Sequence, residues 1–159
     1  MNTKVHFSSA TAEWSTPQEF FDRINATHKF NVDVCATAEN AKCARFFTKE
    51  QDGLKQTWGG LRCWMNPPYG REIGRWVAKA FSESLHEGTT VVALLPARTD
   101  TAWWHTYIED VALVDFIRGR LKFGGHKNAA PFPSALVTWS EKSRLYVRGV
   151  KMVQDMVYP

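Results

Sequence analysis

The sequence has few cysteines, and none has the spacing of a metal or redox pair. The chain contains Cys35, Cys43 and Cys63, an odd number with no C-x-x-C motif. This pattern argues against a disulfide framework and against a structural zinc site. We therefore expect reduced thiols, as in a cytosolic protein, and no bound metal.

Long apolar runs are also missing. No stretch approaches the roughly 18 apolar residues of a membrane span, and residues 1–6 contain no apolar core of a signal peptide. The sequence shows no internal repeat and no low-complexity tract. These absences predict a soluble, intracellular protein without a membrane partner.

What is present is typical of one folded domain. The 159 residues are 44% hydrophobic and include seven tryptophans, and a chain of this length buries about two thirds of its unfolded surface. We predict a single domain over residues 1–159, in which the polar stretch 1–14 is a loose arm over a site. The formal charge of +4 suits a polyanionic partner without requiring one.

Strand and helix patterns alternate along the chain. Runs of strand-like composition occur at 30–36, 61–65, 89–96, 112–117 and 134–139. Helical spacing occurs at 15–28, 71–86 and after residue 100, whereas 37–48 and 145–158 fit either state. The order predicts a three-layer α/β fold with a mainly parallel sheet and an antiparallel hairpin at its edge.

The apolar strand at 61–65 ends at the tetrapeptide Asn66-Pro67-Pro68-Tyr69. The two prolines fix φ at about −65° and lack N–H groups, so they stiffen the turn and push Asn66 toward extended geometry. Open α/β sheets bind ligands beyond the C-terminal ends of their strands. The tetrapeptide is therefore our candidate active site, although such proline turns are also common as purely structural elements.

At this tetrapeptide the sequence resembles the S-adenosylmethionine-dependent amino-methyltransferases with an Asn/Asp-Pro-Pro-aromatic motif. Over most of its length it resembles the small phage DNA adenine-N6 methyltransferases. The match runs in order through 14–17, 33–36, 66–70, 95–100, 119–123 and 131–135. The resemblance implies a Rossmann-like methyltransferase fold, S-adenosylmethionine as the cofactor, DNA as the partner and a phage or prophage origin, with the enzyme acting in the cytoplasm of the host.

The resemblance also implies roles for the tetrapeptide. The amine of adenine would attack the methyl sulfonium directly, while the Asn66 side-chain oxygen and the Pro67 carbonyl accept hydrogen bonds from its two N–H groups. Pro68 would keep these acceptors fixed. Tyr69 would stack on an adenine that is flipped out of double-stranded DNA.

A cofactor site follows from the same resemblance, formed by Ser15, Thr16, Pro17, Asp33, Cys35, Ala36, Asp52 and Asn66. The residues at 15–17 match the segment that closes over the methionine part, and Asp33 matches the carboxylate that pairs with the ammonium. Asp52 falls where an acid lies near the adenine of the cofactor, but Asp52-Gly53 is equally typical of a turn. Glu39 or Asn40 would reach the ribose. The glycine-rich motif of the broader superfamily is missing after Asp33.

Basic residues gather near predicted loop ends, at Arg98, Arg118, Arg120, Lys122, His126 and Lys127. If residues 118–123 continue the strand from 112, alternation places three of these side chains on one face. Phosphate contact is their simplest use, and a solvated basic face explains them equally well. Two alternatives stay open: a methyltransferase for RNA or a protein glutamine, and an inactive nucleic-acid-binding module of the same fold.

Overall fold

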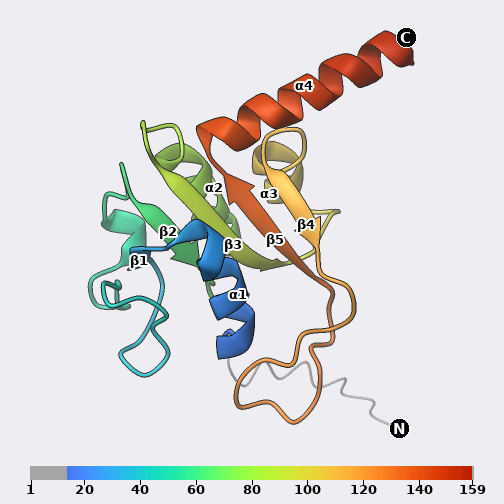
Figure 1. The fold of residues 1–159 in the computed structure, drawn as a ribbon. Coiled ribbons are helices and arrows are strands. Elements are labelled where there is room, and N and C mark those ends of the chain that lie inside the picture. Colours follow the sequence, from blue (N-terminus) through green and yellow to red (C-terminus); the bar gives the residue numbers. More distant parts are fainter. Residues whose placement is uncertain (1–13, 159) are drawn as a thin grey trace, which may run out of the picture.

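The computed structural model describes residues 14–158. A five-stranded sheet forms the centre of the molecule, with the strand order β1-β2-β3-β5-β4 (Figure 1). The arm predicted at residues 1–14 lies outside the described residues, apart from Trp14. Within the described part of the chain, no helix has the length and apolar character needed to cross a membrane.

The sheet is mixed. Its strands are β1 (Val32–Asp33), β2 (Arg62–Met65), β3 (Thr90–Pro96), β4 (Leu113–Phe116) and β5 (Ser134–Trp139). β2 pairs in parallel with β1 and β3, whereas β5 is antiparallel to both β3 and β4. The sheet is less parallel than predicted: within residues 14–158, only the β1–β2 and β2–β3 pairings are parallel, because β5 follows β4 without an intervening helix and inserts between β4 and β3. The antiparallel pair predicted at the edge is confirmed, as β4 and β5.

Helices cover both faces of the sheet. Figure 1 shows α1 (Gln18–His28) in front of the sheet, and α2 (Ile73–Glu83) and α3 (Ala102–Tyr107) behind it. The 3-10 turn η1 (Gly53–Lys55) precedes β2. The last helix, α4 (Glu141–Val157), extends away from the other elements. The stretch 145–158, which fits strand or helix by its pattern, is therefore mostly helical.

The core lies where the apolar faces of these elements meet the sheet. Residues 91–95 of β3 are completely buried, as expected for a strand covered on both faces. On β2, the ring of Trp64 packs edge-on against Phe21 of α1, with 5.3 Å between ring centroids. The apolar face predicted for α2 is buried behind the sheet at Ile73, Trp76, Val77 and Ala80. This packing fixes the end of β2, from which the tetrapeptide emerges.

Two local predictions are wrong. Residues 118–123 do not continue β4, because Gly119 has a φ of +79° and Pro133, on the facing segment, has no N–H to donate. The side chains of Arg118, Arg120 and Lys122 are exposed on this loop and do not share the face of a strand. The helix predicted from residue 15 begins only at Gln18, and Pro17 at its N-cap position makes no side-chain hydrogen bond.

Candidate active site

A cavity of about 730 Å³ lies beyond the ends of β1 and β2, and its volume is that of a typical small-molecule pocket. Its wall brings together most of the predicted site, namely Ser15, Thr16, Asp33, Cys35, Ala36, Asp52, Asn66, Pro67 and Pro68. Among the described residues, Pro17 and Tyr69 are predicted site residues that lie outside this wall. The cavity therefore joins segments that are more than 50 residues apart in the chain.

The side chain of Asn66 is held in one orientation. Its Nδ2 donates hydrogen bonds to the Trp14 carbonyl and to Thr16 Oγ1, the latter at 3.0 Å. Its Oδ1 is buried and has no hydrogen-bond partner within residues 14–158. A buried acceptor without a donor costs about 1–3 kcal/mol. The structure thus presents an amide oxygen that needs an N–H or O–H donor.

The segment from Trp14 to Thr16 is itself fixed by the loop between β4 and β5. The ring of Trp14 stacks on His126 with 4.2 Å between centroids, and the Ser15 carbonyl accepts a hydrogen bond of 2.9 Å from Gly124 N. Thr16 is buried. The hydroxyl of Thr16 is thereby placed to orient the Asn66 amide instead of capping α1.

Tyr69 is enclosed by aromatic side chains of the same loop. Its ring makes edge-on contacts with Phe123 and Phe132, at centroid distances of 6.2 Å and 5.5 Å, and only 7% of the residue is exposed. The hydroxyl donates to the Leu94 carbonyl on β3 at 2.9 Å, and burial raises the pKa of the phenol. A base can stack on this ring only after the loop at 118–133 has been displaced.

The two parts of the Tyr69 side chain have separable effects. We expect Tyr69→Phe to lower the free energy of unfolding by about 1 kcal/mol, because the Leu94 carbonyl loses its donor, while methyl transfer changes less than about threefold. Tyr69→Ala should reduce turnover far more than it weakens cofactor binding. Thermal unfolding, steady-state kinetics and calorimetry measure these quantities. Equal losses of turnover and cofactor affinity in Tyr69→Ala would show that the ring does not contact the base.

Asp33 supplies a buried carboxylate at the cavity wall. The residue is 3% exposed, and its two oxygens accept hydrogen bonds from the backbone N–H groups of Cys35, at 3.2 Å, and Lys42, at 3.0 Å. Burial raises the pKa of Asp33 to about 6, although the two backbone N–H groups act in the opposite direction. Each oxygen still has capacity for a further donor. The carboxylate is therefore well placed to accept a cationic group.

The segment around Asp52 forms a tight turn on the opposite wall. Asp52 has a φ of +55°, and its Oδ1 accepts a hydrogen bond from Leu54 N, so Asp52-Gly53 forms a turn. The side chain of Asp52 also lines the cavity. A Cβ on Gly53 would lie 2.1 Å from the Val34 carbonyl oxygen, so only glycine fits here. Asn40 lines the cavity and its Oδ1 accepts from Thr37 N, whereas Glu39 is exposed.

Several wall residues were missed by sequence reasoning. They include Thr37, Phe47, Thr48, Lys49, Leu54, Arg71 and Trp76. The stretch 37–48 folds as turns with one bridge from Phe46 to Asp33, and such a segment carries no periodic signal. Trp76 belongs to the apolar spacing of a helix, but this spacing does not show whether a side chain packs in the core or lines a cavity.

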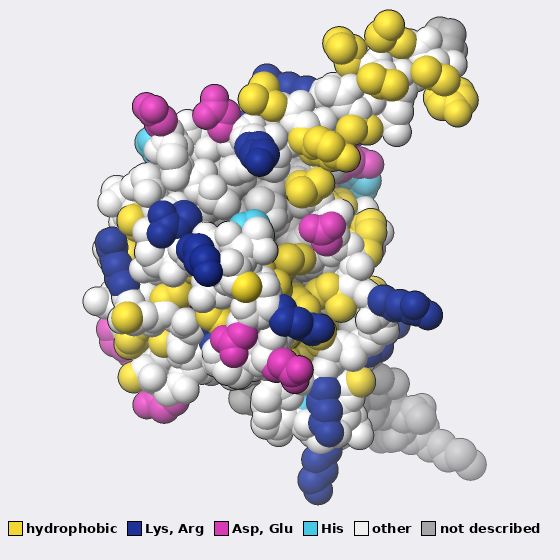
Figure 2. All heavy atoms as spheres, in the orientation of Figure 1, with side chains coloured by type: hydrophobic (Ala, Val, Ile, Leu, Met, Phe, Trp, Pro, Cys, Tyr) yellow, Lys and Arg dark blue, Asp and Glu magenta, His cyan; other side chains and the backbone are white. Residues whose placement is uncertain are grey.

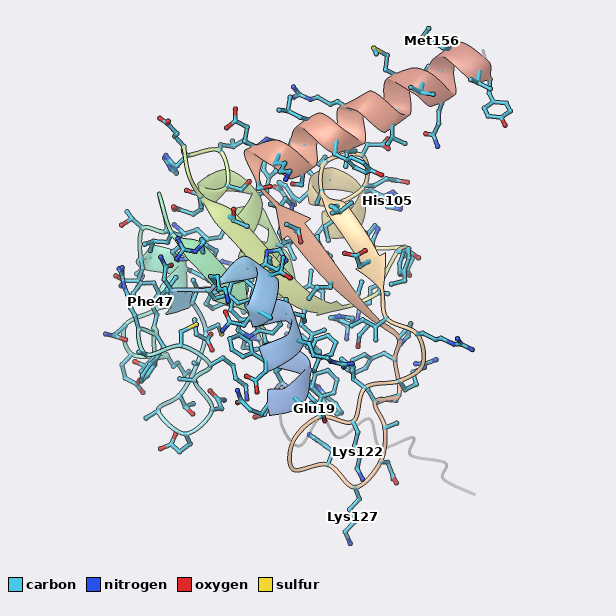
Figure 3. The ribbon with its side chains drawn as sticks, viewed as in Figure 1. Glu19, Phe47, His105, Lys122, Lys127 and Met156 are labelled. Atoms are coloured by element: carbon cyan, nitrogen blue, oxygen red, sulfur yellow. The ribbon has the colours of Figure 1, made fainter. Side chains whose placement is uncertain are left out.

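The predicted nucleic-acid residues lie apart from the cavity. Lys122 and Lys127 extend from the tip of the loop between β4 and β5, away from the sheet (Figure 3). Arg118 and Arg120 are exposed on the same loop, and Arg98 is half-buried after β3. His126 differs from its neighbours, because its ring stacks on Trp14. The loop thus carries basic groups outside and aromatic groups inside, against Tyr69.

An α/β fold with an Asn-Pro-Pro-Tyr loop beside a ligand-sized cavity is the arrangement expected of a methyltransferase, a class whose general methyl donor is S-adenosylmethionine. The chain belongs to the DNA N-6-adenine-methyltransferase (Dam) family, whose model matches residues 4–146. Most of α4, from residue 147 onward, lies beyond this match.

Two phage proteins similar to this chain bear the name DNA N-6-adenine-methyltransferase. The protein of Haemophilus phage HP1 (strain HP1c1) is 35% identical over 106 residues, which are 65% of this chain and 61% of the relative. That of Escherichia phage T1 is 34% identical over 110 residues, or 68% of this chain and 45% of the relative. A putative methyltransferase, YfdM of Escherichia coli (strain K12), is 33% identical over 64 residues, or 36% of this chain and 70% of the relative. The chain therefore spans only about half of the two phage proteins.

Proposed function

We propose that the protein transfers a methyl group from S-adenosylmethionine to the exocyclic N6 amine of an adenine in DNA. The observation that carries the proposal is the buried Asn66 Oδ1, which has no partner in the described chain and is aimed by two hydrogen bonds from Nδ2. An amine N–H is a donor that this oxygen can accept. The family and the names of the two phage relatives indicate adenine in DNA as the substrate.

The cavity fits the cofactor in volume and in the chemistry of its wall. Asp33 offers a buried carboxylate for the ammonium group, and Phe47 and Leu54 offer apolar surface for the adenine ring. Asn40 and Asp52 offer polar atoms in the same wall. When bound, S-adenosylmethionine supplies an electrophilic methyl group on its sulfonium.

Within this site the protein positions the amine and does not need a strong base. The lone pair of an adenine amine is delocalised into the ring, which makes the nitrogen a poor nucleophile. Hydrogen bonds to Asn66 Oδ1 and to the Pro67 carbonyl favour a pyramidal nitrogen, with its lone pair directed at the methyl donor. The rigid prolines keep both acceptors in place, so little reorganisation is needed during the reaction.

The proposal extends to the arrangement of the DNA. The adenine is flipped out of double-stranded DNA and stacks on Tyr69 once Phe123 and Phe132 have moved aside. The chain 1–159 forms one Rossmann-like methyltransferase domain, and the strand ends after Asp33 and Met65 carry part of its site. We propose the cytoplasm of a bacterial host as the location of the reaction, which the phage origin of two relatives supports.

A labelled-cofactor assay tests this function. The protein is incubated with labelled S-adenosylmethionine and with DNA lacking N6-methyladenine, RNA or a protein substrate, and each product is digested to its monomers. We expect N6-methyladenine from DNA alone. Label in RNA or in glutamine would show that RNA or a protein is the substrate instead of DNA. Tight DNA binding without any transfer would contradict the proposed activity.

The exposed loop provides a separate test of DNA contact. We expect Arg120→Ala to weaken DNA binding and to reduce the slope of log K against log salt by about 1, because one phosphate contact is lost. Lys142→Ala, which removes an exposed charge at the start of α4, serves as the control and should leave the slope unchanged. Equal slopes for Arg120→Ala and the wild type would show that Arg120 makes no phosphate contact and is only a solvated surface residue.

A further inference from the structure

The helix α4 carries apolar side chains that nothing in the described chain covers. Figure 2 shows hydrophobic side chains gathered along α4 where it extends from the rest of the molecule. These side chains are between 41% and 75% exposed and belong to Leu145, Tyr146, Val150, Met152, Val153, Met156 and Val157. Their spacing of three and four residues places them on one side of the helix. An amphipathic helix of this kind is normally buried along its apolar face.

The polar side of α4 is the side that contacts the globule. Arg144 donates to the backbone carbonyl and the hydroxyl of Ser84, at 3.0 Å each, and Lys151 pairs with Asp110 at 2.6 Å. Ser143, on the same side of the helix, is buried. The usual orientation is therefore reversed, and the apolar face is directed away from the core of its own chain.

A glycine lies at the middle of this exposed face. A Cβ added to Gly149 would meet no atom within 4 Å, so no contact within the described chain requires a glycine. Glycine in the interior of a helix costs about 1 kcal/mol relative to alanine. Small residues on a helix surface allow a second helix to approach closely.

We propose that two copies of this chain associate through α4, with the two helices packed antiparallel along their apolar faces. The seven exposed side chains form the apolar face that the pair buries, and one partner in a standard interface buries about 800 Å². A twofold axis makes such an interface self-complementary, since the same face is used by both copies. The globules lie at opposite ends of the helix pair.

The charges at one edge of the apolar face favour the antiparallel arrangement. Arg148 and Asp155 are two turns apart on the same side of α4. In an antiparallel pair the same edge of both helices meets, so each Arg148 lies opposite Asp155 of the second copy. The same register sets residue 145 of one copy beside residue 158 of the other, and it aligns the apolar faces over their whole length.

Charge reversal tests this arrangement. Sedimentation of the full chain is expected to show a dimer, which Arg148→Asp and Asp155→Arg should each weaken at least tenfold, because each variant repels itself. A mixture of the two variants should regain the dimer as a heterodimer, since both new pairs are attractive. Arg23→Asp on α1 changes the net charge by the same amount as Arg148→Asp and should leave the dimer intact. Circular dichroism confirms that the helix content is kept.

A second variant separates association from folding. Gly149→Leu should weaken the dimer at least tenfold by separating the two backbones, whereas the thermal stability of the monomer stays equal or rises, because leucine favours a helix. A wild-type chain that remains monomeric at 100 µM, or a mixture of the charge variants that forms no heterodimer, would overturn the proposal. A monomer that binds vesicles of anionic lipid would also overturn it, in favour of a membrane surface.

Discussion

Asn66→Ala is expected to lower the rate of methyl transfer at least about 100-fold, the effect seen when one preorganised hydrogen-bonding group is removed from an active site. The variant loses the oxygen that is proposed to accept an amine N–H, and it also releases the Trp14 carbonyl and Thr16 Oγ1 from Nδ2. Asn66→Asp keeps an acceptor but loses the donor, so an intermediate rate is expected. Single-turnover kinetics with saturating cofactor measure both variants.

The control for this experiment is another asparagine whose side chain has a purely structural partner. Asn31 Oδ1 accepts a hydrogen bond of 2.9 Å from Arg62 N at the start of β2. Asn31→Ala should therefore reduce thermal stability while the rate stays close to that of the wild type. If Asn66→Ala retained a rate within threefold of the wild type, the amide oxygen would have no part in catalysis.

The second large effect is expected at Asp33, where Asp33→Asn should raise the Kd for S-adenosylmethionine about 10- to 100-fold. A hydrogen bond to a charged group is worth about 1.5–3 kcal/mol, and the variant removes the charge. The new amide N–H₂ also faces the backbone donors of Cys35 or Lys42, so some loss of stability accompanies the change. Calorimetry gives the affinity, and thermal unfolding of the same samples verifies that the variant is folded.

The raised pKa of Asp33 predicts opposite pH dependences for binding and for folding. Because the pKa is about 6 in the folded protein against 3.8 for an aspartate side chain in water, the carboxylate is protonated below pH 6 and affinity for a cationic ligand falls there. The stability contributed by this group is complete below pH 3.8 and is lost as the pH rises through 6. Both dependences should disappear in Asp33→Asn, and an affinity that is flat from about pH 5 to 8 in the wild type would contradict the assignment.

Sequence patterns were sufficient where the local signal and the packing agree. β3 is almost purely apolar and lies under both helical layers, and the tetrapeptide after β2 combines two prolines that allow few conformations. The wall residues after β1 and β2, at 35–36 and 66–68, meet because these parallel strands end at one edge of the sheet. In these places short-range chemistry already restricts the fold.

The remaining features depend on contacts that are distant in sequence. Alternating charge at 118–122 resembles a strand, but Gly119 and Pro133 remove the pairing that a strand requires. The direction of β5 follows from its position between β3 and β4, which composition does not encode. Phe47 and Trp76 line the cavity only because an irregular segment folds over the end of β1.

The tetrapeptide alone does not determine which end of the Asn66 amide acts as the acceptor. The oxygen and nitrogen of an amide differ little in shape. A rotation of about 180° around χ2 would direct N–H groups at the amine that the proposed function places there, and would repel it. The Trp14 carbonyl and the Thr16 hydroxyl select the other rotamer, and the loop at 118–133 holds them through Gly124 and His126. The orientation of the Asn66 amide is thus set by a segment 50 residues earlier in the chain.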